Sequence, residues 1–98
     1  MGMDFEWDAA KCAANIQKHR IDFEDAIGIF EGPILEAPSP RGEEMRWIAL
    51  GETEGRVIAV IFTRREGVVR IISARAARKN EREHYRSRFS REAQEGQD

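Results

Sequence analysis

The spacing of hydrophobic and polar residues predicts a strand and two helices in the first third of the chain. Residues 5–8 alternate and predict a short strand, and Asp8 is a suitable helix N-cap because its carboxylate can accept from free backbone N–H groups. Residues 9–19 are helix formers without a breaker, which predicts a helix. A second helix over 22–30, capped by Asp22, is predicted from apolar residues spaced i, i+3, i+4 and i+7. Those positions are Phe23, Ala26, Ile27 and Phe30.

The middle of the chain changes to a period of two. Residues 31–44 hold all three prolines and two glycines, which predicts a loop with a short edge strand at 34–37. Residues 45–52 alternate, 56–63 are continuously apolar and β-branched, and 68–75 predict a third strand. Short polar turns join these three segments, so we expect an antiparallel meander.

The C-terminal part predicts a charged helix over residues 78–91 with few apolar positions, followed by a frayed tail at 91–98. The whole of residues 1–98 is then one domain of the α+β class. It would have a largely antiparallel sheet, two N-terminal helices on one side and a basic C-terminal helix.

Charge is strongly segregated along the chain, although the net charge is only -2. Residues 1–45 carry 4 basic and 10 acidic side chains, whereas residues 46–91 carry 12 basic and 5 acidic ones. Of the 16 basic residues 13 are arginines, whose planar guanidinium groups bind phosphate or carboxylate in a bidentate way. The basic half therefore indicates recognition of a polyanion, with ordinary surface ion pairing as the alternative.

Several functional classes lack their sequence signals. No apolar run approaches the roughly 18 residues of a membrane span, and the N-terminus does not resemble a signal peptide. A single cysteine, Cys12, fits a reducing cytoplasm. Two histidines without a ligand motif, and no phosphate-binding loop, give no sign of a metal or nucleotide. We expect a cytoplasmic protein without membrane contact, metal or cofactor.

Candidate chemistry is concentrated in the arginines of the predicted sheet. Arg70 and Arg75 belong to the third strand of the meander, Arg46 belongs to a neighbouring strand, and Arg64 lies in the hairpin between the second and third strands. Antiparallel pairing is expected to bring these side chains together on one sheet face. Closely packed guanidinium groups repel each other unless an anion intervenes, and this anion is either an internal carboxylate such as Glu81 or a phosphate.

The predicted C-terminal helix adds a second basic row, made by Arg78, Lys79 and Arg82. Tyr85 lies near this row and either packs in the core or offers a ring and hydroxyl to a ligand. Trp47 poses the same choice between a core anchor and a stacking platform. His19 ends a helix, where a cation complements the helix dipole, and is a weaker candidate.

The chain resembles a known family in six segments, taken in order. They are "FEWD" (5–8), "DFEDAIGIF" (22–30), "RWIALG" (46–51), "GRVIAVIFT" (55–63), "RIISAR" (70–75) and "KNEREHY" (79–85). These resemble the BrnT toxins, the ribonuclease halves of bacterial type II toxin–antitoxin pairs. Where this family usually has glycine after "KH", the chain has Arg20. Because glycine suits a left-handed helix end, this difference concerns the stability of the helix more than catalysis.

The resemblance implies a RelE-like α+β fold and cleavage of RNA without a metal. It also implies a ribbon-helix-helix antitoxin, called BrnA in the family, in a 2:2 complex that binds promoter DNA through the antitoxin. Metal-free cleavage uses the 2′-OH as the nucleophile and needs a base, an acid and cations at the phosphorane.

Catalytic roles follow as hypotheses. Arg75 and Arg70 are the candidates for stabilising the phosphorane. Glu81 is the candidate base, or else a partner that holds Arg75 or Arg82, and Tyr85 or His19 is the candidate acid. The expected RNA-binding set is Arg46, Trp47, Arg64, Arg78, Lys79, Arg82 and His19.

Two alternatives come from other functional classes. A non-catalytic module would use the same basic face to bind RNA or an acidic protein without cutting it. An inactive toxin would only form the antitoxin complex.

Overall fold

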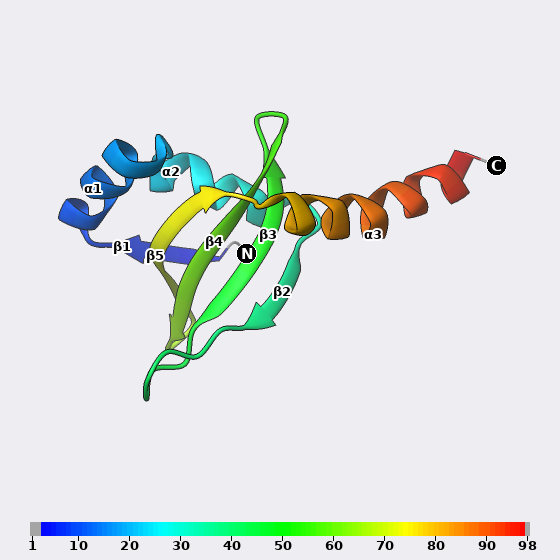
Figure 1. The fold of residues 1–98 in the computed structure, drawn as a ribbon. Coiled ribbons are helices and arrows are strands. Elements are labelled where there is room, and N and C mark those ends of the chain that lie inside the picture. The colour runs from blue at the N-terminus through cyan, green and yellow to red at the C-terminus, as the bar shows by residue number, and fades with distance from the viewer. Residues whose placement is uncertain (1–2, 98) are drawn as a thin grey trace.

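A computed structural model describes residues 3–97 and the side chains of residues 3–89, and it confirms the α+β class. Figure 1 shows the order of the elements along the chain. They are β1 (Asp4–Trp7), α1 (Ala9–His19), α2 (Phe23–Ala26), the 3₁₀ helix η1 (Ile27–Glu31), β2 (Leu35–Pro38), β3 (Trp47–Thr53), β4 (Arg56–Arg65), β5 (Val68–Ala76) and α3 (Lys79–Gln97). No helix among the described residues is long and apolar enough to cross a membrane. The fraying expected at 91–98 stays a prediction, because the side chains of these residues and the whole of residue 98 lie outside the described part.

The five strands form one sheet in the order β1-β5-β4-β3-β2. Strands β2 to β5 pair antiparallel, which confirms the predicted meander and the edge strand. Strand β1 joins the far edge in parallel with β5, with Phe5 beside Val69. Parallel pairing requires a long connection, and here residues 8–67 provide it.

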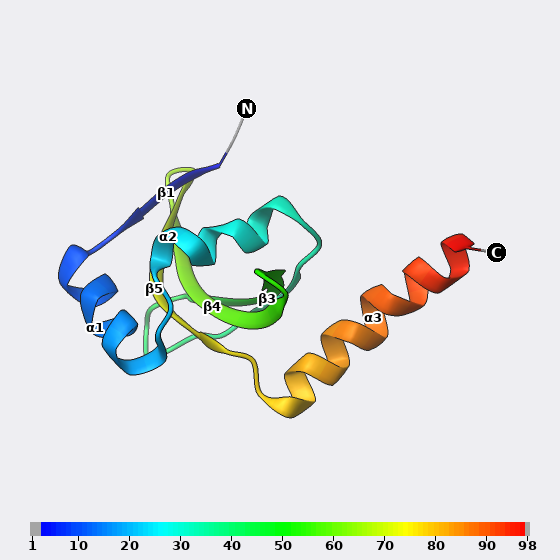
Figure 2. The same cartoon turned by 90° about the horizontal axis from the view of Figure 1, so that it is seen from above.

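The sheet has an inner face, covered by α1, α2 and η1, and an outer face, on which α3 begins. Figure 2 shows α2 and η1 on one side of β3 and β4 and the start of α3 on the other, with the rest of α3 pointing away. The main core lies on the inner face. Its largest fully buried side chains are Phe23, Phe62, Ile29, Ile58, Ile71 and Val60. A smaller cluster on the outer face joins Leu50, Val57, Ala59, Ala77 and Tyr85.

The ends of α1 follow the predicted capping chemistry. The Asp8 carboxylate accepts from the Lys11 N–H at 3.0 Å, and the Asp22 carboxylate likewise accepts from Glu24 N–H at the start of α2. Helix α1 ends at His19, and its C-cap residue Arg20 has φ 61° and ψ 31° and donates its N–H to Ile16 O. An arginine therefore occupies the left-handed position at which glycine is less strained.

One buried polar side chain connects α1 to the sheet. The Asn15 amide donates to the carbonyl oxygens of Ile21 and Ala74, each at 2.9 Å, and its oxygen accepts from the Ala74 N–H at 3.2 Å. Because Asn15 is only 6% exposed, these hydrogen bonds fix how α1 lies across β5.

The second predicted helix differs from the prediction in its last turn. After Ala26 the chain tightens into η1, whose period is three, so Ile29 is fully buried while Ile27 and Phe30 are half-buried. The close approach of η1 to β3 explains the change. A Cβ on Gly51 would fall against the Ile29 side chain, so glycine leaves the room that η1 requires.

Candidate functional site

A β-bulge in β5 decides which side chains reach the outer face. Arg75 lies five positions after Arg70, and because five is odd these two side chains would lie on opposite faces of a regular strand. The register skips Ile72: Phe62 pairs with Ile71, and Ile61 pairs with Ser73. The extra residue returns Ser73 and Arg75 to the outer face that Arg70 occupies. The bulge at Ile72, and not regular alternation along the strand, therefore places Arg70 and Arg75 on the same face of the sheet.

Arg75 and Glu81 make a bidentate ionic contact on the outer face. The two guanidinium nitrogens of Arg75 donate to the two carboxylate oxygens of Glu81 at 2.8 and 3.0 Å. Their side chains are 21% and 17% exposed, so this bidentate pair is partly shielded from water. The third contact of Glu81, from the Arg78 N–H at 2.7 Å, is the return half of a capping box at the start of α3.

These contacts change the chemistry of the carboxylate. The hydrogen bonds from Arg75, and to a lesser extent from the Arg78 backbone, lower the pKa of Glu81 from 4.5 to about 2, against the opposing effect of burial. A group with so low a pKa is a weak proton acceptor near neutral pH. The contacts of Glu81 thus favour the alternative in which it holds Arg75 in place.

Two cavities adjoin on the outer face. One, of about 310 Å³, lies between the β2–β3 loop and the sheet and is lined by Ser39, Pro40, Arg41, Arg46, Ile61, Ile72 and Ser73. The other, of about 200 Å³, lies between β2, β3 and the start of α3. Its lining includes Glu81 and His84 beside Ile48, which pairs with Ile61 of the first cavity. We call the two cavities together the trough: Arg41 and Arg46 line one part of it, and Glu36 and Glu81, the partner of Arg75, line the other.

Two of the candidate arginines are paired with exposed acids. Arg46 pairs with Glu44, and Arg70 lies 3.7 Å from Glu6 of β1, in a pair whose two side chains are more than 40% exposed. Internal carboxylates, the alternative to a phosphate, therefore balance these arginines in the free protein. Exposed pairs of this kind contribute at most about 1 kcal/mol, so a phosphate can replace the carboxylate at little cost.

The expectation that Arg64 shares a sheet face with the other arginines is wrong. Arg64, the residue before the last of β4, lies on the inner face, where it pairs with Glu36 and its guanidinium lies 4.9 Å from the centre of the Trp47 ring. Trp47 packs against the main core and stacks on Phe62. Both residues therefore lie across the sheet from Arg75, because odd and even positions of a strand face opposite ways.

Tyr85 belongs to the core of the outer cluster. It is 5% exposed, and its hydroxyl donates to the Pro33 carbonyl at 2.9 Å, which ties α3 to the segment before β2. Burial raises the pKa of Tyr85 above its ordinary value of 10. A buried hydroxyl that already has an acceptor is poorly placed to donate a proton to a substrate, which favours the core alternative for this residue.

The helix residues of the predicted RNA-binding set do not all lie near Arg75. Arg78 and Lys79 are exposed at the start of α3, and Arg82 donates to the Ala77 carbonyl at 2.7 Å. His19 is half-buried at the end of α1, on the inner side of the sheet. The structure therefore groups Arg78 and Lys79 with Arg75, and leaves His19 apart.

His84 lines the trough, although it is not among the site residues predicted from the sequence. It is exposed and lines the same cavity as Glu81, which lies one helical turn before it in α3. The signal was present in the i, i+3 spacing of the two residues, but only the helix orientation shows that this face of α3 turns toward the sheet. Among the described side chains no group of three His, Cys, Asp or Glu residues is arranged to hold a metal ion.

Comparisons with known proteins agree with one another. The model of the family described as "Ribonuclease toxin, BrnT, of type II toxin-antitoxin system" matches residues 7–81. The fold is similar to the crystal structure of the Brucella abortus ribonuclease toxin, BrnT, with a TM-score of 0.62 and 33% sequence identity, over 80% of this chain and 100% of that one. No curated protein matches the chain.

Proposed function

Because the chain belongs to the BrnT family of ribonuclease toxins of type II toxin–antitoxin systems, we propose that its outer face binds RNA and cleaves it. In this proposal the ribose 2′-OH attacks the adjacent phosphate, and no metal takes part. The observation that carries the proposal is the bulge at Ile72, which brings Arg70, Ser73 and Arg75 to one face beside the trough. A strand without that bulge would divide these residues between two faces.

The roles proposed for the side chains follow from their contacts. Arg75, oriented by Glu81, stabilises the charge that develops on the phosphorane, since its guanidinium is fixed before the substrate arrives. Arg46 and Arg70 exchange their exposed carboxylate partners for flanking phosphates. Arg78 and Lys79 extend the cationic surface along α3.

Proton transfer is the role that we assign to His84. Histidine is the residue type that both accepts and donates a proton near neutral pH, and His84 is exposed in the trough beside Glu81. The low pKa of Glu81 and the burial of Tyr85 leave these two residues less suited to that role. His84→Ala should therefore slow cleavage and change its pH profile, whereas RNA binding should change little.

The partner is an antitoxin, as the family description implies. We further propose that this antitoxin has a ribbon-helix-helix fold, that the two proteins form a 2:2 complex acting on promoter DNA through the antitoxin, and that both work in the cytoplasm. Support for these finer points is the resemblance of the sequence to BrnT toxins, together with the arginines of the outer face that a partner would have to cover.

A second candidate function is binding of RNA without cleavage, and the low pKa of Glu81 favours it because it weakens the candidate base. Incubation of the purified protein with RNA in EDTA separates the two. Fragments ending in a 2′,3′-cyclic phosphate and beginning with a 5′-hydroxyl support the enzyme, whereas retention of intact RNA supports the binder. Arg75→Ala should abolish cleavage and relieve growth arrest; an equally toxic Arg75→Ala protein would refute the assignment.

A further inference from the structure

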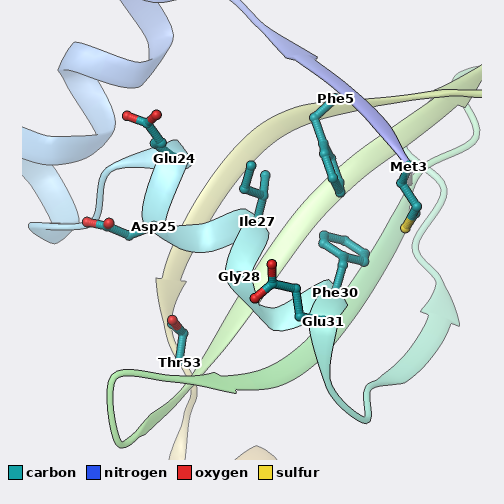
Figure 3. Close-up of a pocket in the computed structure, with 9 residues that line it drawn as sticks. All are labelled: Met3, Phe5, Glu24, Asp25, Ile27, Gly28, Phe30, Glu31 and Thr53. Atoms are coloured by element: carbon teal, nitrogen blue, oxygen red, sulfur yellow. The ribbon is translucent and has the colours of Figure 1, made fainter. Parts of the chain in front are cut away.

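A further cavity lies away from the outer face. It measures about 650 Å³ and opens between β1, α2, η1 and the end of β3 (Figure 3). Its residues are Met3, Phe5, Glu24, Asp25, Ile27, Gly28, Phe30, Glu31 and Thr53. The proposed cleavage of RNA uses none of them.

The floor of this cavity is apolar. Phe5 and Phe30 turn toward each other in Figure 3, with their ring centres 5.3 Å apart, and Ile27 lies beside them. All three are only partly buried and pack against the main core from outside. Met3, at the rim, is 47% exposed. Apolar surface left open in this way is a feature of binding sites more than of ordinary surface.

The rim of the cavity is acidic. Glu24, Asp25 and Glu31 are exposed, and Figure 3 shows Glu24 and Asp25 directed outward at one edge and Glu31 lying along η1. Among the described side chains no lysine or arginine lies within salt-bridge distance of these three carboxylates, in contrast to the paired acids Glu6, Glu36, Glu44 and Glu81. Three unpaired carboxylates around an apolar floor complement a segment that carries both cationic and apolar side chains.

We propose that this cavity, the acidic pocket, binds a basic segment of the antitoxin that contains an apolar anchor residue. The proposal rests on the proposed function in so far as the chain is a toxin with a protein partner. RNA is repelled by the three carboxylates, so the pocket suits a protein ligand. The apolar anchor would contact Phe30 and Met3, and lysine or arginine side chains on either side of it would reach Glu24 and Glu31.

The location of the acidic pocket has a consequence for neutralisation. Phe5 and Thr53 belong to β1 and β3, yet the pocket lies on the side of the sheet covered by α2 and η1, across from Arg75. A segment held there leaves the trough of the outer face uncovered. The same antitoxin molecule therefore needs a second contact to block RNA, and the acidic pocket serves to anchor it.

Charge reversal in the acidic pocket tests the proposal. The antitoxin encoded with this chain is immobilised, and its dissociation constant is measured for wild type and for Glu24→Lys/Glu31→Lys. Replacement of two attractive charges by repulsive ones should weaken the complex at least about tenfold, mostly through dissociation, and less at high salt. Met3→Ser, which leaves the charge unchanged, should weaken it about fivefold through lost apolar contact.

The matched control is Glu43→Lys/Glu83→Lys, which changes the net charge equally at two exposed acids outside the acidic pocket. It should not weaken the complex. Equal affinity of the pocket variant and wild type, or equal weakening by the control, would overturn the proposal. Concentration-dependent dimers of the free protein that vanish in the pocket variant would also overturn it and assign the pocket to a second copy of this chain.

RNA cleavage by the same variants keeps the two proposals apart. The pocket variant should cut RNA at the wild-type rate, because its substitutions lie across the sheet from Arg75. Weakened antitoxin binding by a protein that never cuts RNA would sustain the acidic pocket and reject the proposed function. If the pocket variant instead binds the antitoxin as tightly as wild type and the protein cuts RNA, the proposed function would be sustained and the acidic pocket rejected.

Discussion

Replacement of Glu81 by glutamine should destabilise the protein by about 2 kcal/mol at neutral pH. The carboxylate accepts two hydrogen bonds from Arg75 and one from the Arg78 N–H, and glutamine offers one acceptor oxygen in place of two. A pKa lowered from 4.5 to about 2 corresponds to an upper limit of about 3 kcal/mol. Because both side chains of the pair are about one-fifth exposed, solvent screening reduces this to about 2 kcal/mol.

The assay is chemical denaturation of the wild type and Glu81→Gln at pH 7 and at pH 3. The folded-state pKa of Glu81 lies below its ordinary value, so its contribution is fully present above about pH 4.5 and is lost as the pH falls toward 2. The difference in the free energy of unfolding should therefore drop to less than half by about pH 3. Glu83→Gln, an exposed neighbour on α3, is the control and should change stability by less than about 0.5 kcal/mol.

Two results would refute this reasoning. A Glu81→Gln protein as stable as Glu83→Gln at pH 7 would mean that the bidentate pair does not hold the start of α3. A large difference that stays the same between pH 7 and pH 3 would mean that the loss comes from packing and not from the ionised carboxylate.

Three further substitutions test other parts of the structure. Asn15→Ala should lower the free energy of unfolding by about 3 kcal/mol, because it leaves three buried backbone groups without partners; equilibrium denaturation checks this. Arg20→Gly should raise it by up to about 1 kcal/mol through relief of a left-handed backbone, seen as a higher midpoint with an unchanged slope. Tyr85→Phe should cost about 1 kcal/mol through loss of the bond to Pro33, yet cut RNA at the wild-type rate; a dead but folded Tyr85→Phe enzyme would restore Tyr85 as the acid.

Local patterns predicted most of the elements, because each element carries its own signal. Asp8 and Asp22 predicted the starts of the two helices, and the β-branched run at 56–63 predicted the central strand. The exception is the last turn of the segment at 22–30. By sequence alone its spacing fits an α-helix. The room left by Gly51 allows a tighter helix, in which Ile29 is buried against β3, and this packing is better.

The candidate site was less predictable, because its geometry depends on non-local pairing. Nothing in "RIISAR" marks Ile72 as the bulged residue, although the bulge decides that Arg70 and Arg75 share a face. The pairing of Arg64 with Glu36 likewise depends on how β2 returns along β3. The acidic pocket brings together residues 3–5, 24–31 and 53, and no short sequence window contains them.

The most direct test of the central claim is cleavage of an RNA oligonucleotide in EDTA, compared with a copy that has a single 2′-deoxy substitution at the nucleotide before the cut. If the outer face promotes attack by the 2′-OH, the substituted copy will bind with similar affinity and remain whole at that position, while the unmodified RNA is cut. Cleavage of both oligonucleotides at the same bond would contradict the account.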